Sequence, residues 1–365
     1  MERFRISSKQ FSIIVAVFTI GTTILVTPGV VANRAKQDSW MVPLIGIGVG
    51  VLIILLYTSI AKLYPQKNFF ETILYIFGKW LGTAVNIFLV IIFIITASQT
   101  IWYLGNFLKV QVLTEVPIYA IHIIYTVVVI YGARLGLETI SRSAQFLFPT
   151  IIFLFILVTI LIAPQSKLEN LQPIFEYGLK PILSAAVVQI SILCLPLIIL
   201  LMIPSDWVEP ATNYRKSFIT GYIMGGAVMF ITTLFCILVL GHKITAQSEF
   251  PTYLLAKKVN VLNFFQRMEP IIAIMWMISI FYRTSLYMNA ALIGIYNVFN
   301  LKDYKYIVTP LGIFVLGLSL IAFPDTAYQY EWDSLTWISI VMTFGLLLPL
   351  LLIILGLLKK KKQSA

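Results

Sequence analysis

The sequence has little charge and few of the side chains that carry catalytic chemistry. Charged residues make up 11% of its 365 residues, and there are only two histidines and two cysteines. His122 and His242 are far apart in the chain, and Cys194 and Cys236 lie in separate apolar runs without metal-ligand neighbours, so neither a metal site nor a disulfide is expected. The HExxH, GxSxG, P-loop and GxGxxG patterns are missing as well. We therefore expect a protein that is not an enzyme and has no cofactor.

Apolar residues, by contrast, are abundant. Hydrophobic residues make up 59% of the chain, and its mean hydropathy is +0.94. Apolar runs of about twenty residues recur, and each is long enough to cross a bilayer as a helix. The sequence therefore predicts an all-α polytopic membrane protein. Ten transmembrane helices are expected, at about residues 11–32, 41–63, 80–108, 117–133, 145–163, 179–203, 217–240, 270–298, 306–323 and 336–358.

The net charge of +11 comes from basic residues in short loops and at both ends of the chain, including a lysine run at 359–362. This distribution is typical of membrane orientation and lipid-headgroup contact, so no nucleic acid is expected as a partner. More Lys and Arg fall on the side of the two termini, which predicts that both termini are cytoplasmic. Residues 323–337 are acidic and are expected to form an outer loop.

Two of the apolar runs contain residues that weaken a helix. Gly21 and Pro28 interrupt the first, beside threonines whose hydroxyls can replace lost backbone hydrogen bonds, and Pro196 interrupts the sixth. Broken helices that open each half of a polytopic chain favour two inverted five-helix repeats around a binding site at the membrane midplane. Ordinary proline kinks are the alternative. The expected parts are a cytoplasmic segment (1–10), a first repeat (11–163), an outer loop (164–178), a second repeat (179–358) and a basic cytoplasmic tail (359–365).

Arg283 is the sharpest single feature, because it lies in the middle of an apolar span. A buried arginine must be paired or hydrated, and no Asp or Glu lies deep inside a predicted span. Its guanidinium is suited to bidentate recognition of a ligand carboxylate. Capping of the carbonyls of a broken helix is the alternative role.

Other polar residues recur at helical spacing. Tyr287 shares a face with Arg283 and would contact a ligand or pack between helices. In the third span, Thr96, Gln99 and Tyr103 form one stripe, which favours either ligand binding or hydrogen bonding between helices.

A broken helix can direct free amide groups at a ligand carboxylate and free carbonyls at an ammonium group. Leu195 would instead shape an apolar side of the pocket. The candidate residues at the two breaks are Gly21, Thr22 and Thr23 in the first span and Ser191, Cys194 and Leu195 in the sixth.

Four short motifs follow one another along the chain: Gly21-x-x-Ile24-Leu25-x-x-Pro28, Asn170-Leu171-x-Pro173 with Gly178-x-x-Pro181-Ile182, Arg267-Met268-Glu269 and, more weakly, Gly136-x-Glu138-x-Ile140-x-Arg142. In order and spacing the sequence resembles the B-subunit family of endospore germinant receptors, within the amino acid–polyamine–organocation transporter superfamily. It departs from that family's pattern at several positions, which indicates a ligand specificity of its own. These positions are Thr23, Thr100, Trp102, Pro196 and Ile198.

The resemblance implies a LeuT/APC-type fold and a germinant-sensing role. A small nutrient, most simply an amino acid, would bind between helices 1, 3, 6 and 8 and shift the conformation. It also implies A-type and C-type receptor subunits as partners and the inner membrane of a spore as the location. An amino-acid permease is the alternative, favoured by a lysine in the fifth span or a buried acid, neither of which the sequence reveals. A sugar or an inorganic ion as ligand, and a scaffold with a vestigial pocket, also remain open.

Overall fold

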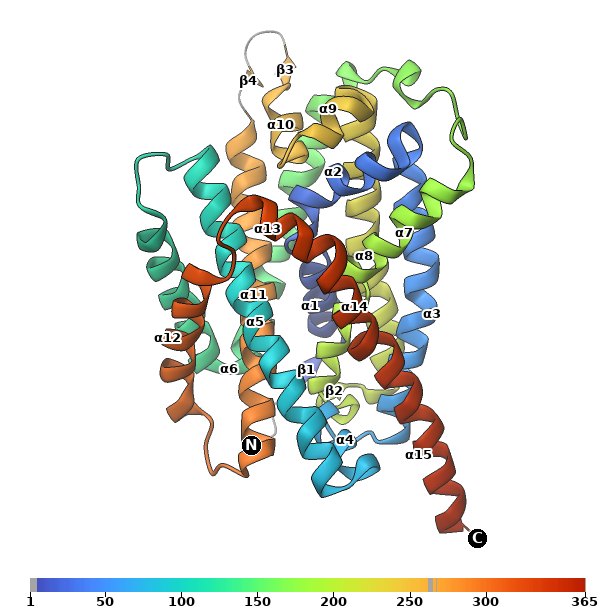
Figure 1. The fold of residues 1–365 in the computed structure, drawn as a ribbon, viewed down its shortest axis with the longest axis vertical. Helices are drawn as coiled ribbons and strands as arrows, with labels where there is room; N and C mark the ends of the chain where they lie inside the picture. Colours follow the sequence, from blue (N-terminus) through green and yellow to red (C-terminus); the bar gives the residue numbers. More distant parts are fainter. Residues whose placement is uncertain (1–4, 262–264, 267, 365) are drawn as a thin grey trace.

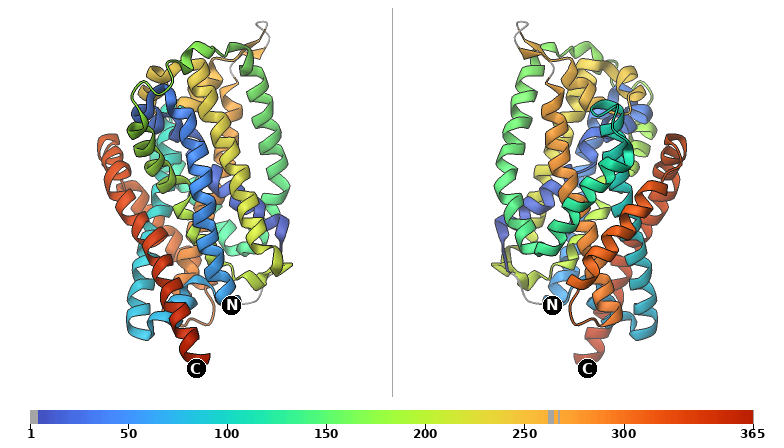
Figure 2. Two further views of the ribbon diagram at one scale, coloured as in Figure 1. Left: turned by 90° about the vertical axis from the view of Figure 1, so that its right-hand side faces the viewer. Right: turned by 90° about the vertical axis from the view of Figure 1, so that its left-hand side faces the viewer.

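The computed structural model describes residues 5–261, 265–266 and 268–364, and it is mostly helical (Figure 1). The long helices run roughly along the longest axis of the molecule, as Figure 2 shows from two sides. The helices of the first half are α1 (Ser8–Ile20), α2 (Thr23–Ala35), α3 (Met41–Leu63), α4 (Phe69–Phe77), α5 (Lys79–Gln111) and α6 (Ile118–Ile162). Those of the second half are α7 (Leu179–Leu193), α8 (Tyr214–Phe235), α9 (Gly241–Gln247), α10 (Pro251–Lys257), α11 (Glu269–Phe299), α12 (Lys305–Ile321), α13 (Thr326–Glu331), α14 (Trp337–Met342) and α15 (Leu348–Ser364).

Short elements connect these helices. Strand β1 (Ile6–Ser7) pairs in parallel with β2 (Val208–Glu209), and β3 (Asn260–Val261) pairs antiparallel with β4 (Phe265–Gln266). The 3-10 helices are η1 (Lys36–Trp40), η2 (Ala163–Gln165), η3 (Leu168–Leu171), η4 (Leu195–Met202), η5 (Ser205–Trp207) and η6 (Ala211–Asn213). The π-helical turns are η7 (Cys236–Leu240), η8 (Trp332–Thr336) and η9 (Thr343–Leu347).

Seven helical stretches among the described residues are long and apolar enough to cross a membrane, and α1 and α12 are shorter apolar helices. Large apolar side chains such as Leu52, Ile124 and Phe153 point outward from them, each more than 60% exposed. An apolar outer surface of this extent is expected where lipid replaces water as the surrounding solvent. The seven stretches are Thr23–Leu63, Lys79–Gln111, Ile118–Gln165, Leu179–Met202, Ala211–Gln247, Glu269–Phe299 and Thr326–Lys361.

Helix α6 consists of two parts that meet at Gly136. At 45 residues it would be about 67 Å long if straight, roughly twice the thickness of a bilayer core. Gly136 has φ 85° and ψ 169°, which is a non-helical conformation that glycine adopts easily. The sequence predicts two spans here with a connection at 134–144, and the structure continues helical hydrogen bonding through most of that connection.

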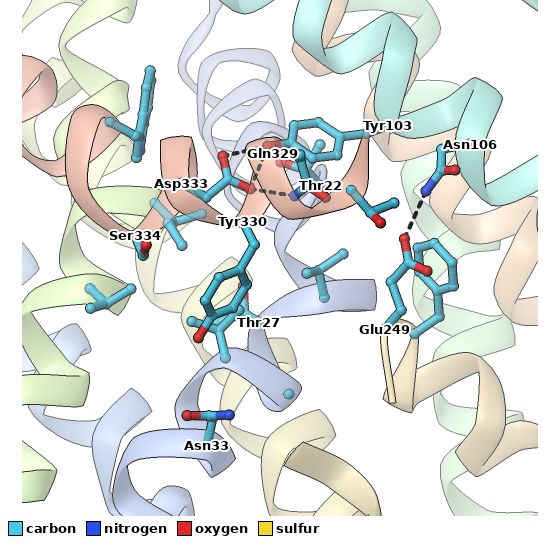
Figure 3. A pocket seen from close by; sticks show the side chains of 18 of the residues that line it. Thr22, Thr27, Asn33, Tyr103, Asn106, Glu249, Gln329, Tyr330, Asp333 and Ser334 are labelled. Carbon is cyan, nitrogen blue, oxygen red and sulfur yellow. Dashed lines mark hydrogen bonds between the residues drawn. The ribbon is translucent and has the colours of Figure 1, made fainter. Parts of the chain in front are cut away.

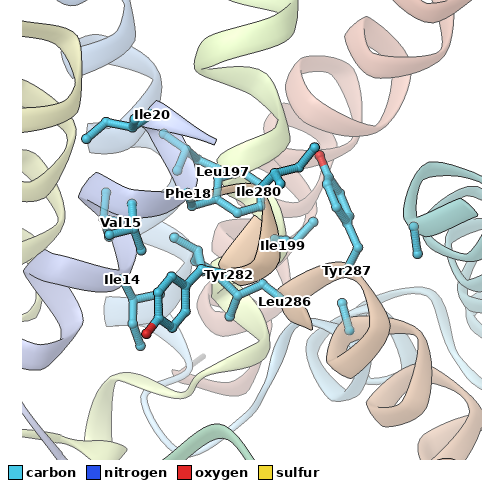
Figure 4. Packing of buried hydrophobic residues seen from close by; sticks show 14 of the residues in the cluster. Ile14, Val15, Phe18, Ile20, Leu197, Ile199, Ile280, Tyr282, Leu286 and Tyr287 are labelled. Atoms are coloured by element: carbon cyan, nitrogen blue, oxygen red, sulfur yellow. The ribbon is translucent and has the colours of Figure 1, made fainter. Parts of the chain in front are cut away.

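Helix α1 lies at the centre of the core and packs against α8, α6 and α11 (Figure 4). Two glycines of α8 let it approach closely: a Cβ at Gly221 would lie 2.2 Å from the Ser12 carbonyl oxygen, and one at Gly225 would lie 2.6 Å from the Thr19 Cβ. Glycines four residues apart present a flat face to a neighbouring helix. The start of α1 is fixed by Ser7, whose hydroxyl accepts from the Gln10 amide at 3.1 Å.

The ends of the described chain, β1 and α15, lie toward one end of the molecule, and α9, α10 and the β3–β4 hairpin lie at the other (Figure 1).

Residues 323–337 differ from the loop that the sequence predicts. They contain α13 and η8, and the helical path continues into α14. Because of this difference, residues of α13 and η8 line the cavity that is described below. Arg267, part of one of the sequence motifs, lies outside the described residues.

Candidate functional site

A cavity of about 380 Å³ lies between α2, α5, α7 and α11 and is bounded by α13, η8 and the segment that joins α9 to α10 (Figure 3). Four of these elements correspond to the first, third, sixth and eighth spans of the sequence prediction. The C-terminal segment is an addition, because sequence reasoning places it in an outer loop. Five of the residues expected from the sequence line the cavity: Thr22, Thr96, Gln99, Tyr103 and Arg283.

The junction between α1 and α2 forms one wall. Helix α1 ends at Ile20 and α2 begins at Thr23, and Gly21 between them has φ 4° and ψ −119°. A Cβ at Gly21 would lie 2.5 Å from the Cδ of Arg283 and 2.9 Å from the Phe18 carbonyl oxygen, so glycine is required for this close approach. Thr22 faces the cavity.

Thr23 has a different role. Its hydroxyl donates to the carbonyl oxygens of Thr19 at 2.6 Å and Ile20 at 2.8 Å. Thr23 therefore satisfies the last carbonyls of α1, and it is not among the residues that line the cavity.

Arg283 of α11 is 3% exposed and borders the cavity. Its Nη2 donates to the Ile192 carbonyl at the end of α7, at 2.9 Å, and its guanidinium carbon lies 4.9 Å from the centre of the Phe18 ring. Nε and Nη1 have no partner with hydrogen-bond geometry among the described residues, although the buried Tyr287 hydroxyl lies close enough to interact with the guanidinium. The guanidinium thus caps α7, as one sequence interpretation expects, and it also retains donors for an anionic group.

The polar stripe of α5 faces the cavity along its length. Gln99 is 5% exposed, and the Thr96 hydroxyl donates back to the Ile92 carbonyl at 2.8 Å. The Tyr103 hydroxyl donates to Asp333, at 2.6 Å from Oδ1 and 2.7 Å from Oδ2.

Asp333 is the functional candidate that sequence reasoning missed. Its Oδ2 also accepts from Gln329 Nε2 at 2.6 Å (Figure 3). The sequence assigns this aspartate to an outer loop, whereas the structure places it on η8 at the cavity. Gln329 and Asp333 are four residues apart and Tyr330 and Ser334 repeat that spacing, a helical signal that could have identified this face.

The residues expected around Pro196 do not line the cavity. The Ser191 hydroxyl donates to Val188, the Cys194 thiol contacts the Gly50 carbonyl at 3.7 Å, and Leu195 is fully buried. Helix α7 contributes Val188 and Ile192 instead.

Tyr287 is buried in the core, and it is not among the cavity-lining residues either. Its ring centre lies 5.4 Å from that of Phe18 and 6.4 Å from that of Phe93. Of the two roles considered for Tyr287 in the sequence analysis, this environment corresponds to packing between helices.

Beside the cavity, α5 is joined to the segment between α9 and α10. Asn106 Nδ2 donates to Glu249 Oε1 at 2.7 Å, and the Thr252 hydroxyl donates to the Ile24 carbonyl of α2 at 2.6 Å. Burial raises the pKa of the Glu249 carboxyl, and the hydrogen bond from Asn106 opposes that shift.

The lining of this cavity is suited to the binding of a small molecule. Among the described residues no group of three or more His, Cys, Asp or Glu side chains could hold a metal ion. The lining offers hydroxyls, amides and both signs of charge around a largely apolar space, which is the usual composition of a small-molecule site.

A family model described as "Spore germination protein" matches residues 5–320. The chain belongs to this family. It is 26% identical to spore germination protein KB of Bacillus subtilis (strain 168), over 100% of this chain and 98% of that protein. It is 24% identical to spore germination protein A2 of the same organism, over 98% and 97%. It is also 19% identical to spore germination protein XB of Bacillus anthracis, over 96% and 98%.

Solved structures identify the fold. Mhp1, a nucleobase-cation-symport-1 family transporter in a closed conformation with bromovinylhydantoin bound, is similar with a TM-score of 0.68 at 12% identity, over 90% of this chain and 74% of that one. MhsT in complex with L-phenylalanine is similar with a TM-score of 0.65 at 14% identity, over 94% and 88%. This spore germination protein therefore has the fold of the LeuT-type transporters. With its apolar helices, it is an integral membrane protein of the spore germination family.

Proposed function

We propose that this chain is the B-type, germinant-sensing membrane subunit of a spore germinant receptor. The observation that carries the proposal is a largely apolar cavity beside the α1–α2 junction, with a buried arginine whose donors are only partly satisfied. A buried guanidinium with free donors favours an anionic partner, because an unpaired charged donor away from water costs several kcal/mol.

The proposed topology has ten spans in two inverted five-helix repeats, at 11–163 and 179–358. Helices α1 and α2 together make the first span, since α1 alone is too short to cross a bilayer. Helix α6 supplies two spans because of its length and its non-helical Gly136. Helix α7 with η4 makes the sixth, and the helical path from α14 to α15 makes the tenth.

In the proposed complex, a small nutrient, most simply an amino acid, lies between the first, third, sixth and eighth spans. Arg283 holds its carboxylate, and Thr22, Gln99 and Tyr103 offer neutral hydrogen bonds. The likeness to a fold that binds L-phenylalanine in MhsT supports an amino acid in this position. Thr96 also lines the cavity, and the remaining expected residues surround it without lining it: Gly21, Thr23, Ser191, Cys194, Leu195 and Tyr287.

Binding would signal through differential affinity for two arrangements of the helices. The proposed partners are the A-type and C-type subunits of the receptor, and the proposed location is the inner spore membrane. Both termini would be cytoplasmic, supported by the basic residues near both ends of the chain.

An amino-acid permease is the second candidate, and one observation favours it. Sequence reasoning weighs against transport because it finds no buried acid, yet Asp333 lies at the cavity. Ionisable groups within membrane segments frequently serve transport.

The test is a thermal-shift screen of the purified chain against the common L-amino acids, sugars and salts, followed by uptake into proteoliposomes. A ligand at 100 times its Kd stabilises the native state by about 2.7 kcal/mol. Stabilisation that Arg283→Ala removes, without uptake, supports the receptor. Gradient-driven uptake supports the permease. The absence of stabilisation by every compound would contradict nutrient binding by this chain.

A further inference from the structure

Two opposite charges, Arg283 of α11 and Asp333 of η8, line the same cavity without pairing with each other. The ion pairs found among the described residues are Arg5–Glu209 and Arg142–Glu138, and all four of these side chains are exposed. Both cavity charges are therefore available to a third group.

Asp333 retains capacity to accept hydrogen bonds. Tyr103 has one hydroxyl proton, shared between the two carboxylate oxygens, and Gln329 donates one more to Oδ2. A carboxylate offers about four acceptor positions. Tyr103 and Gln329 thus fix the orientation of the carboxylate while leaving positions free for a cationic donor, and such preorganisation favours binding.

Three carbonyl groups at α7 and η4 that could receive a ligand ammonium group each already accept one side-chain donor. Trp337 donates to the Ser191 carbonyl at 3.1 Å, and Arg283 donates to Ile192. Tyr57 donates to the Leu195 carbonyl at 3.0 Å.

The carbonyls at the end of α1 are similarly engaged by the Thr23 hydroxyl. These carbonyls therefore have less accepting capacity left for an ammonium group than the Asp333 carboxylate has. Asp333 is a stronger acceptor, because it carries a formal charge.

The overall charge of the residues that line the cavity favours a ligand that carries both a positive and a negative group. Besides Arg283 and Asp333, the charged residues around the cavity are Arg34 and Glu249. Two arginines and two carboxylates make a formally neutral site with separated charges. A site of this kind favours a ligand that is net neutral and carries both signs, since a net charge moved out of water must be compensated.

We propose that Asp333 is the ammonium-binding residue of the cavity and that its ligands are zwitterionic α-amino acids, with the carboxylate at Arg283. The assignment rests on the proposed function, namely nutrient binding in this cavity. It adds a binding residue from the C-terminal segment and narrows the ligand class from small nutrients to molecules with both charges.

The experiment compares three matched sets of compounds on the purified full chain, with Kd obtained from thermal-shift titrations. The amino acids are L-alanine, L-valine and L-phenylalanine. The matched amines are ethylamine, isobutylamine and phenethylamine. The matched carboxylates are propionate, isovalerate and 3-phenylpropionate. D-Glucose is included as an uncharged polyol.

In the wild type we expect at least one amino acid to bind about tenfold or more tightly than both its amine and its carboxylate. Asp333→Asn keeps the size of the side chain and removes its charge. It should raise the Kd of that amino acid about tenfold to a hundredfold, the usual effect of losing a hydrogen bond to a charged group, and leave the Kd of the carboxylate within about twofold. Glu331→Gln is the matched control, because it removes an exposed acid two residues away that does not line the cavity.

Equal affinity of the wild type for an amino acid and its carboxylate would overturn the role of Asp333, and this comparison needs no variant. An unchanged amino-acid Kd in Asp333→Asn would overturn it as well. Stabilisation by D-glucose alone would overturn the assignment of α-amino acids as the ligands, but it would still support nutrient binding by this chain. If none of these compounds stabilises the wild type, the assignment is overturned, and the proposed function fails with it only when the full screen of L-amino acids, sugars and salts is negative as well.

Discussion

The α1–α2 junction and the α7–η4 junction arise from similar sequence signals but have different environments. At the first junction Gly21 packs against Arg283 and Thr22 faces the cavity. At the second, Leu195–Met202 forms a 3-10 helix whose residues are all buried. The first junction borders the cavity through Thr22, whereas at the second only Ile192 at the end of α7 reaches the cavity and η4 is enclosed by protein.

The donors that satisfy the two junctions come from different parts of the chain: the neighbouring Thr23 at the first, and distant side chains at the second. In a membrane a carbonyl released from a helix must find another partner, because no water is at hand. Side chains at positions 57, 283 and 337 supply those partners to the second junction. An interrupted apolar helix is therefore not by itself evidence of a binding site, because its free carbonyls can be satisfied within the protein.

Arg283 connects the two junctions, so replacing it should have the largest effect. Arg283→Ala should weaken amino-acid binding at least a hundredfold and leave the Ile192 carbonyl without its donor, at a cost of about 1–3 kcal/mol in unfolding free energy. Arg283→Lys keeps the charge but loses the planar fork, so it too should abolish the response to a carboxylate nutrient. Thermal-shift titration measures both effects, and membrane fractionation checks that the variants are inserted. Wild-type binding by the lysine variant would mean that a point charge is enough.

The next largest effect is expected at Gly21, which affects the first junction alone. The Cβ of Gly21→Ala would lie 2.5 Å from Arg283 Cδ, so the arginine must move. We expect at least tenfold weaker amino-acid binding, with a stability loss of about 1–3 kcal/mol from overpacking. Gly48→Ala is the control, since nothing lies within 4 Å of its added Cβ. If Gly21→Ala and Gly48→Ala have the same amino-acid Kd, the contact between Gly21 and Arg283 does not affect ligand binding.

Local physics made much of this site predictable from the sequence. Thr96, Gln99 and Tyr103 recur at helical spacing, so they had to share a face, and all three line the cavity. The cost of burying a charge identified Arg283, and the helix-weakening residues identified the junction at Gly21.

The parts that could not be predicted depend on contacts between distant segments. Asp333 follows a proline-containing acidic stretch that is typical of a loop, and only its packing against Tyr103 shows that it faces the cavity. Occupation of the carbonyls around Pro196 depends on Tyr57 and Trp337, which lie more than a hundred residues away from it. Composition contains no information about such pairings.

Two tyrosines allow the same chemical change to be made in the two environments. Tyr57 donates to the carbonyls of Leu195 at 3.0 Å and Gly345 at 2.5 Å, whereas Tyr103 donates to Asp333. Tyr57→Phe should lower stability by about 1–3 kcal/mol, because two buried carbonyls lose their donor, and leave the amino-acid Kd within about twofold. Tyr103→Phe should raise the Kd severalfold with a smaller loss of stability, because Gln329 still donates to Asp333. Unfolding and ligand titrations on both variants separate the two effects, and a Kd change in Tyr57→Phe would show that the second junction also communicates with the cavity.

The smallest effect is expected at Glu249, which lies just before α10, the helix whose Thr252 donates to the Ile24 carbonyl near the first junction. Burial gives the Glu249 carboxyl a pKa above its ordinary value of 4.5 in the folded protein. The folded state therefore holds this proton more readily than the unfolded state, so stability should fall as pH rises through the folded pKa. Glu249→Gln retains an oxygen for Asn106 and should remove this fall, by less than about 1 kcal/mol because the side chain is partly solvated. Thermal unfolding between pH 4 and 8 tests it, with the exposed Glu169→Gln as the control. An unchanged slope in Glu249→Gln would assign the titration to another group and leave the segment over the first junction without a pH-dependent contact.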